Sequence, residues 1–440
     1  AGFLAFAALA LRVGRAPFAL ALFGAAGFTF SNMNYAKLGH PIYAPVGLLA
    51  LLVLLYARAL AALPSSPGRA HRDGLLGALL FGFLLFTCFQ VAWYGALLAL
   101  ATALVLALAW PQVLRGAVGA VGPARLAGFA AVQAGALVAA SVPFLIVFGR
   151  AWAAGESRPY WAVLIYAARP LDAFNVGGAN LLWGWLAQLT GRVSSPAELS
   201  AEFSLAQTPV VAAVFLILLI WTWRRHTRQA GELRVPAILA GGVAAIALAP
   251  LAYKIGTISG WWLLRQIVPG ATAIRTPFRI QLALALPHWF VIVAGAALLR
   301  EAMAARRAAV MAGMVSLGAL MLVEQVNLAN QSALDRPAEL ARTGRIAAAP
   351  PQCRAFFATS TERTRGHFAI QTDAMMVALR ERIPTLNGES GSRPPEWDLL
   401  RVYDAGYLDN VADWVRSTDA AAGLCRLELP EGRWSPWAPP

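Results

Sequence analysis

Ten apolar stretches, separated by arginine-bearing loops, constrain this chain more than any other feature. A helix needs about 20 apolar residues to cross the hydrocarbon of a bilayer. With 59% hydrophobic and only 13% charged residues among 440, the composition is far from that of a soluble protein. We therefore expect an all-α polytopic membrane protein with about ten spans: Ala1–Leu11, Pro17–Ser31, Pro41–Ala57, Leu75–Ala92, Gly95–Trp110, Ala124–Phe148, Pro209–Trp223, Val235–Ala252, Ile280–Leu299 and Ala308–Val323.

The distribution of arginine predicts which loops face the cytoplasm, because short cytoplasmic loops collect Lys and Arg. The loops on one side hold most of the loop arginines, from Arg12 to Arg307, and few acids. On this orientation the long loops 149–208 and 253–279 lie outside the membrane. The chain also begins within a half-length span and without Met, so we expect at least one further helix, with its outer loop, before residue 1.

The composition changes after residue 325, where the apolar runs stop and acids, prolines and glycines appear. We expect a membrane domain, 1–325, and a small extracytoplasmic α+β domain, 326–440, which is large enough to fold by itself. In an oxidising compartment Cys353 and Cys425, near the two ends of this domain, can form a disulfide, and two buried free thiols are the alternative. The predicted strands are Phe368–Gln371 and Cys425–Leu429, and the predicted helices are Asp373–Arg382 and Tyr407–Ser417.

The net charge of +14 reflects membrane topology and not nucleic-acid binding. A nucleic-acid interface needs a clustered basic face with base-stacking aromatics, whereas the basic residues here are dispersed over membrane loops, so no nucleic-acid partner is expected. Only Lys37 and Lys254 among the 36 basic residues are lysines. This bias indicates a GC-rich bacterial genome, and hence a bacterial cytoplasmic (inner) membrane location.

Basic residues at the outer helix mouths are the candidates for phosphate binding. Arg275 and Arg279 stand four residues apart directly before a predicted helix, and Lys254 belongs to the same outer loop. The arginine fork binds two phosphate oxygens at once. Lys37 and His40, at another helix mouth, can also donate to anionic oxygens. The alternatives are contacts of the arginines with anionic lipid headgroups and interfacial anchoring of Lys37.

Ionisable candidates for proton transfer are weaker. Glu156 and Asp172, in loop 149–208, could act as a general base for an acceptor hydroxyl, but plain ion pairs with neighbouring arginines are the favoured interpretation. His288 lies inside a predicted span, where a hydrogen-bonded core histidine is favoured over a functional one. Glu324, at the outer end of the last span, is expected to meet the interface.

Compact catalytic motifs are missing from the sequence. It contains no nucleophile elbow, P-loop, HExxH or zinc pattern, so no cofactor is identified. A divalent metal has no motif to support it, although one held partly by residues before Ala1 stays open.

Three short runs carry a resemblance to a known group of membrane proteins. Asn34–Leu49, with Gly39, His40, Pro41 and Pro45, resembles the segment after the early helices of bacterial GT-C-type membrane glycosyltransferases and of the related YfhO-like proteins. Ile274–Arg279 resembles the loop that those proteins carry before a late helix. The tail run Pro384–Gly391, followed by Pro394, Pro395 and Trp397, is similar to tails in the same broad group.

The resemblance implies a GT-C-like enzyme that moves a sugar from a polyprenyl-phosphate donor to an extracytoplasmic acceptor, such as a cell-envelope glycan, lipid or protein. The catalytic acid of such families is usually an Asp or Glu in the first outer loop. No position of this sequence matches it, and we expect that loop to precede Ala1.

Two other classes of function stay open. A lipid or polysaccharide transporter or flippase would need polar residues at mid-membrane depth and usually an internal repeat, of which only His288 is seen. A non-catalytic membrane assembly protein would use the helices as an anchor and the tail for binding.

Overall fold

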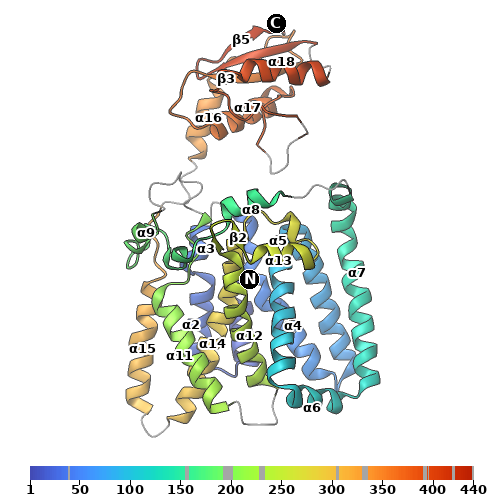
Figure 1. Cartoon of the computed structure of the whole chain (residues 1–440), viewed down its shortest axis with the longest axis vertical. Coiled ribbons are helices and arrows are strands. Elements are labelled where there is room, and N and C mark those ends of the chain that lie inside the picture. The colour runs from blue at the N-terminus through green and yellow to red at the C-terminus, as the bar shows by residue number, and fades with distance from the viewer. Residues whose placement is uncertain are drawn as a thin grey trace. The chain divides into compact units, whose positions relative to one another are not determined.

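The computed structural model describes residues 1–37, 40–153, 158–191, 202–226, 233–303, 307–329, 335–389, 394, 396–418 and 422–438. The internal contacts of the chain divide it into two compact units, Ala1–Ser332 and Ala333–Pro440. The first is a bundle of long helices, and the second is a smaller unit of helices and strands (Figure 1).

The first unit is almost wholly helical. Its α-helices are α1 (Gly2–Arg12), α2 (Phe18–Thr29), α3 (Asn32–Ala36), α4 (Leu48–Ala62), α5 (Pro67–Ala109), α6 (Pro111–Val121), α7 (Pro123–Ala153), α8 (Tyr160–Tyr166), α9 (Leu186–Leu189), α11 (Pro209–His226), α12 (Arg234–Leu248), α13 (Trp261–Ile267), α14 (Ile280–Ala302) and α15 (Arg307–Val323). Short 3-10 helices are η1 (Pro41–Gly47), η2 (Pro170–Phe174), η3 (Ala249–Ala252), η4 (Ala271–Ala273) and η5 (Pro277–Arg279). The strands β1 (Lys254–Ile255) and β2 (Ile258–Ser259) form an antiparallel hairpin with a two-residue turn.

Five helices among the described residues are long and apolar enough to cross a membrane: Ile42–Ala62, Pro67–Ala109, Pro123–Arg150, Arg234–Ala252 and Pro277–Ala302. Their mean hydropathy lies between 2.0 and 2.2. The predicted helical architecture with membrane-type helices is thus confirmed at this level. The count of ten spans stays a prediction.

α5 consists of two helices joined by a reversal at Cys88, whose φ of −153° and ψ of 87° are not helical. A continuous helix of 43 residues would be about 65 Å long. Yet Ala70, near the start of α5, shares an apolar cluster with Val121 of α6, which follows the end of α5. The chain therefore folds back at Cys88, a few residues before the break predicted between Ala92 and Gly95.

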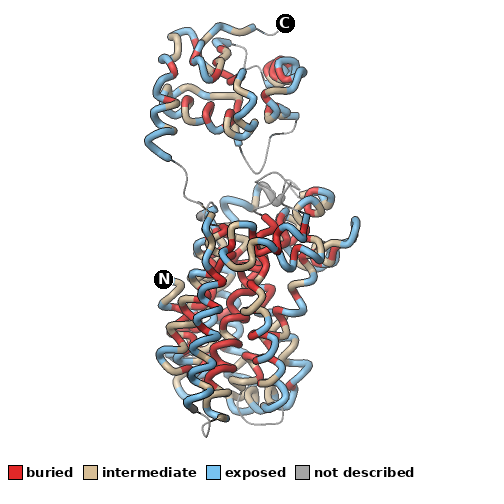
Figure 2. Tube along the Cα trace, turned by 90° about the vertical axis from the view of Figure 1, so that its left-hand side faces the viewer, coloured by how far each residue is buried: buried red, intermediate tan, exposed pale blue. Residues whose placement is uncertain are grey.

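α14 is the central helix of the first unit. Its apolar window is 83% buried, whereas that of α7 is only 6% buried, and Figure 2 shows the buried residues along the inside of the bundle. A helix that is apolar on every side belongs in a core. α14 packs against α2, α11 and α12, so the residues at its N-terminus are held by several elements at once.

A buried carboxylate ties the end of α15 to the start of α11. Glu324 is fully buried and accepts hydrogen bonds from Trp183 Nε1 at 2.9 Å, Thr208 Oγ1 at 2.5 Å and the backbone N–H groups of Val210 at 3.0 Å and Val211 at 2.8 Å. The last two are unpaired donors of the first turn of α11. The expectation that Glu324 meets the interface is therefore wrong, because Trp183, Thr208 and the start of α11 cover it.

The segment after α15 remains attached to the helical unit. Leu181 donates its N–H to the Val326 carbonyl at 2.9 Å, and Leu328 donates to Ala179 at 2.8 Å. Asn327 Nδ2 donates to Asn32 Oδ1 at 2.8 Å. This attachment places the boundary between the units at 332/333, a few residues later than the predicted 325/326.

The second unit packs helices against a three-stranded sheet. Strand β3 (Ala355–Ser360) is parallel to β4 (Leu424–Leu429), which is antiparallel to β5 (Arg433–Pro436). The helices are α16 (Arg336–Gly344), α17 (His367–Glu381) and α18 (Tyr407–Thr418).

Three of the four elements predicted for this unit are confirmed and one is wrong. The predicted helix Asp373–Arg382 matches the second part of α17. The predicted strand Cys425–Leu429 lies in β4, and the predicted helix Tyr407–Ser417 is α18. The predicted strand Phe368–Gln371 is instead the first part of α17. The buried residues Ile370, Ala374 and Val377 follow the helical spacing of four and three, which outweighs the local strand preference.

Cys353 and Cys425, which are 72 residues apart in the sequence, form a disulfide. It joins the segment just before β3 to β4. We expect replacement of both cysteines by serine to lower the free energy of unfolding of this unit by about 4 kcal/mol, because the longer loop becomes free in the unfolded chain. Protease resistance of the unit in the full-length protein, followed over a urea series, measures this loss.

A reductant provides the matched control for the disulfide. It should lower the urea midpoint of the wild type to that of the double variant and leave the double variant unchanged. Equal midpoints for the oxidised wild type and the double variant would show that the cross-link adds no stability.

Candidate functional site

Three of the five predicted phosphate-binding residues converge on one carboxylate, Glu202. Lys37 Nζ lies 3.0 Å from Glu202 Oε2, and Arg279 Nε donates to the same oxygen at 2.8 Å, while Arg279 Nη2 bonds Oε1. His40 Nε2 lies 3.8 Å from Oε1. Lys37, His40, Glu202 and Arg279 are called the ion cluster below.

Local structure fixes each member of the ion cluster. Lys37 ends α3, and Arg279 is the residue at which η5 passes into the central helix α14. Glu202 is followed by the fully buried Phe203 and Leu205, which anchor its segment in the core. The three charges thus come from parts of the chain that only the fold brings together.

The ion cluster borders the reversal of α5. The Arg279 guanidinium lies 4.9 Å from the centre of the Tyr43 ring, a cation–π contact, and its Nη1 donates to the Tyr43 hydroxyl. That hydroxyl donates in turn to Gln90 Oε1 at 2.5 Å. Gln90 stands two residues after Cys88, so the broken helix supplies one wall of the site.

The ion cluster is buried except at His40. The side chains of Lys37, Glu202 and Arg279 are 1%, 6% and 12% exposed, whereas His40 is 48% exposed. Burial alone would raise the pKa of Glu202, but the Arg279 hydrogen bond and the Lys37 and Arg279 charges outweigh it and lower this pKa to about 2. Glu202 is therefore ionised at every physiological pH.

The pKa values of the two other titratable members, Lys37 and His40, are lowered. Burial lowers the pKa of Lys37 to about 8, with a further contribution from the Arg279 charge, although Glu202 opposes both. Burial and the Lys37 charge lower the pKa of His40 below its usual value. At neutral pH the ion cluster thus holds two cations, one carboxylate and a neutral imidazole.

Spare hydrogen-bond donors lie at Lys37 and His40. Arg279 uses Nε and Nη2 on Glu202 and Nη1 on Tyr43. Within the described part of the chain, Lys37 Nζ has no hydrogen-bond acceptor besides its Glu202 ion partner. A net positive site with unused N–H groups suits an anionic oxygen, whereas Glu202, with its low pKa, is a poor proton acceptor.

The other predicted site residues in the described part of the chain make their contacts within loops 158–191 and 253–279. Lys254 Nζ donates to the Leu164 carbonyl, and the Arg275 guanidinium lies 4.7 Å from the centre of the Tyr166 ring. Asp172 is fully buried and accepts the Arg169 N–H at 2.6 Å. Glu156 lies outside the described residues.

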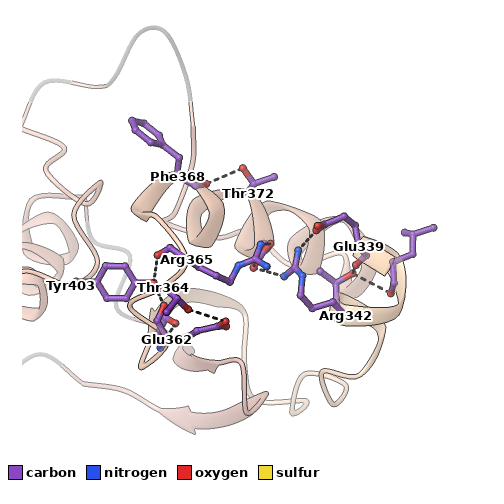
Figure 3. A network of polar contacts seen from close by, with 12 residues as sticks. Glu339, Arg342, Glu362, Thr364, Arg365, Phe368, Thr372 and Tyr403 are labelled. Atoms are coloured by element: carbon purple, nitrogen blue, oxygen red, sulfur yellow. Dashed lines mark hydrogen bonds and ion pairs between the residues drawn. The ribbon is translucent and has the colours of Figure 1, made fainter. Parts of the chain in front are cut away.

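The polar cluster of the second unit is structural (Figure 3). Arg342 bonds both Glu339 and Asp373, and Arg365 Nη2 lies 3.4 Å from Asp373 Oδ2. The adjacent cavity has a volume of about 20 Å³, room for one water. Across the residues that the structure describes in both units, no group of three or more His, Cys, Asp or Glu side chains could hold a metal ion.

Sequence reasoning missed Glu202, Tyr43 and Gln90. Glu202 is an ordinary loop acid in the sequence, and its only distinguishing sign is the apolar pair Phe203 and Leu205 that follows it. No protein-family model and no curated protein matches this chain.

Proposed function

We propose that this protein is a GT-C-type membrane glycosyltransferase whose ion cluster holds the phosphate of a polyprenyl-phosphate sugar donor. The observation that carries the proposal is the convergence of Lys37, His40 and Arg279 on a single buried carboxylate. Phosphate needs several donors and a net positive charge, and this site has both.

The proposed topology has ten spans in the inner membrane of a bacterium, with the ion cluster and the second unit on the outer side. The five membrane-length helices and the reversal at Cys88 support it. A lipid-linked donor would then place its phosphate at the outer interface and its sugar in the aqueous loops, where an envelope glycan, lipid or protein accepts it.

Within the site, Glu202 organises the cations and Lys37 and His40 face the phosphate. The half-exposed His40 is the first donor that a headgroup meets, and a bound phosphodiester anion favours its protonated form. The guanidinium of Arg279 stays hydrogen-bonded to Glu202, so Arg279 contributes positive charge to the phosphate site. Glu202 is not the base that activates the acceptor, because its two cation partners hold it ionised.

Sugar transfer by the full-length protein in liposomes, with a panel of labelled polyprenyl-phosphate hexoses and pentoses, tests the proposal. We expect His40→Ala and Lys37→Met each to lower transfer about tenfold or more, the effect of losing a hydrogen bond to a charged group. Lys37→Met keeps the Arg279–Glu202 pair, so the fold should be preserved.

Lys254→Met is the matched control, because it removes the only other lysine, which bonds a backbone carbonyl in an outer loop. Its transfer rate should stay within about twofold of the wild type, the range of a surface substitution. Unchanged transfer by Lys37→Met and His40→Ala would refute the assigned phosphate site.

A transporter or flippase is the second candidate. The burial of the charged side chains of Lys37, Glu202 and Arg279 favours it, because ionisable groups among membrane helices often mark a substrate path. The same liposomes distinguish the two functions, since a flippase would move labelled lipid between leaflets without sugar transfer.

A further inference from the structure

A groove of about 610 Å³ runs between α11 and α12, which both pack against α14. Its walls include Phe215 and Leu216 of α11 and Ile246 of α12, and the β1–β2 hairpin closes one end. The volume falls within the usual 300–1,000 Å³ of a small-molecule site. The ion cluster contributes no residue to its lining.

The rim of the groove is apolar and exposed. Ile255 and Ile258 of the hairpin are 77% and 76% exposed, and Ile246 of α12 is 43% exposed. Such side chains are unfavourable at a water-filled entrance and favourable beside lipid. The groove therefore suits a molecule that arrives from the bilayer.

His288 of α14 presents a polar atom to this groove. It is 9% exposed and packs against Phe215 with ring centres 4.2 Å apart. Its Nδ1 bonds the Leu284 carbonyl. Because a carbonyl oxygen can only accept, Nδ1 carries the hydrogen, and in the neutral ring Nε2 is then a bare acceptor.

The Nε2 acceptor of His288 receives no hydrogen bond from the described part of the protein. Among the described residues none bonds Nε2, and Tyr253 is the only other polar side chain of the described lining. A plain hydrocarbon would leave Nε2 unsatisfied, which is costly in an apolar site. An anionic group would bring no hydrogen to Nε2 and would lose its hydration.

We propose that this groove binds an apolar, membrane-dissolved molecule with a hydroxyl group, of the long-chain alcohol class, whose O–H donates to Nε2 of His288. The hydrocarbon part lies between α11 and α12. The site is separate from the ion cluster and does not depend on the function proposed for it.

Photolabelling of the full-length protein in phosphatidylglycerol nanodiscs tests this site. The probes are a diazirine-bearing hexadecanol and the matching diazirine-bearing hexadecane, which differ only in the hydroxyl. We expect the alcohol to label the peptides of α11, α12 and the hairpin about tenfold more than the alkane, the effect of one buried hydrogen bond. Equal labelling of the wild type by both probes would overturn the proposal, whatever the variants do.

Three variants identify the atom and the groove, and a fourth, in the ion cluster, is the control. His288→Phe keeps a ring against Phe215 but removes the acceptor, so the preference for the alcohol should vanish. His288→Gln restores an acceptor oxygen and should recover part of it. Ala212→Trp, at a partly buried position of α11 that lines the groove, should fill it and block both probes, whereas His40→Ala should leave labelling unchanged. A preference that survives His288→Phe would contradict the role of Nε2.

Discussion

Glu202→Gln should destabilise the helical unit by about 3–5 kcal/mol, because removal of one partner of a buried ion pair leaves the other charge uncompensated. Here two cations lose their counter-charge, since Lys37 and Arg279 both pair with this carboxylate. Their side chains are almost wholly buried, so water cannot replace it. The amide that remains offers one acceptor oxygen and no charge.

The pH dependence of unfolding separates the contributions of Glu202 and Lys37. The pKa of Glu202 falls from 4.5 to about 2 on folding, so its stabilisation is present above pH 4.5 and is lost as pH falls toward 2. The pKa of Lys37 falls from 10.5 to about 8. The unfolded chain therefore binds more protons between these values, and stability rises with pH across that window.

Melting temperatures of the detergent-solubilised protein between pH 3 and pH 10 measure both effects. The difference in melting temperature between the wild type and Glu202→Gln should become smaller toward pH 10, because neutral Lys37 needs no counter-charge. It should not vanish, because Arg279 stays charged and still lacks its partner in the variant. The control is Asp413→Asn, which breaks an exposed ion pair with Arg416 and should change stability by less than about 1 kcal/mol. A gap that does not depend on pH would contradict the role of Lys37.

Glu324→Ala is the second change with a large expected effect. Four donors lose their acceptor, namely Trp183 Nε1, Thr208 Oγ1 and the N–H groups of Val210 and Val211. A buried donor without a partner costs about 1–3 kcal/mol, so we expect a loss of at least 3 kcal/mol. Glu324→Gln should lose less, because it keeps one acceptor oxygen.

Hydrogen exchange identifies where that stability is lost. The amides of Val210 and Val211 should exchange faster in Glu324→Ala, because the first turn of α11 loses its cap. Glu301→Ala, at an exposed position of α14, is the control and should leave both amides and the melting temperature unchanged. Unchanged exchange in Glu324→Ala would show that the carboxylate does not stabilise this turn.

The helical architecture was predictable because apolar runs bounded by Pro, Gly and Arg have few other ways to fold. The boundaries were less certain, as α5 shows. The predicted break consisted of Trp93 and Tyr94, two aromatic residues with a polar edge. Both side chains are instead buried in the core, and the chain reverses earlier, at Cys88. Tertiary packing, which a single sequence does not show, decides such positions.

The candidate site was predictable only in part, because tertiary contacts decide its composition as well. Lys37, His40 and Arg279 could be selected because basic residues at helix mouths on the predicted outer side are unusual. Their common partner could not, since Glu202 is 77 residues from Arg279 and only the folded chain brings them into contact. Arg275 has the same sequence setting as Arg279, yet it lies over Tyr166, so residue type and spacing alone do not distinguish the two.

The attachment of the segment after α15 has a mechanical consequence. A pulling force on the second unit would enter the helical unit at Leu328 and Asn327, where the backbone is bonded to Ala179 and the side chain to Asn32. These bonds would be sheared together before α15 could be peeled from its neighbours. Tension on the second unit is thus transmitted first to α3, which ends at Lys37, and to the loop that holds Ala179, and not to the long helices.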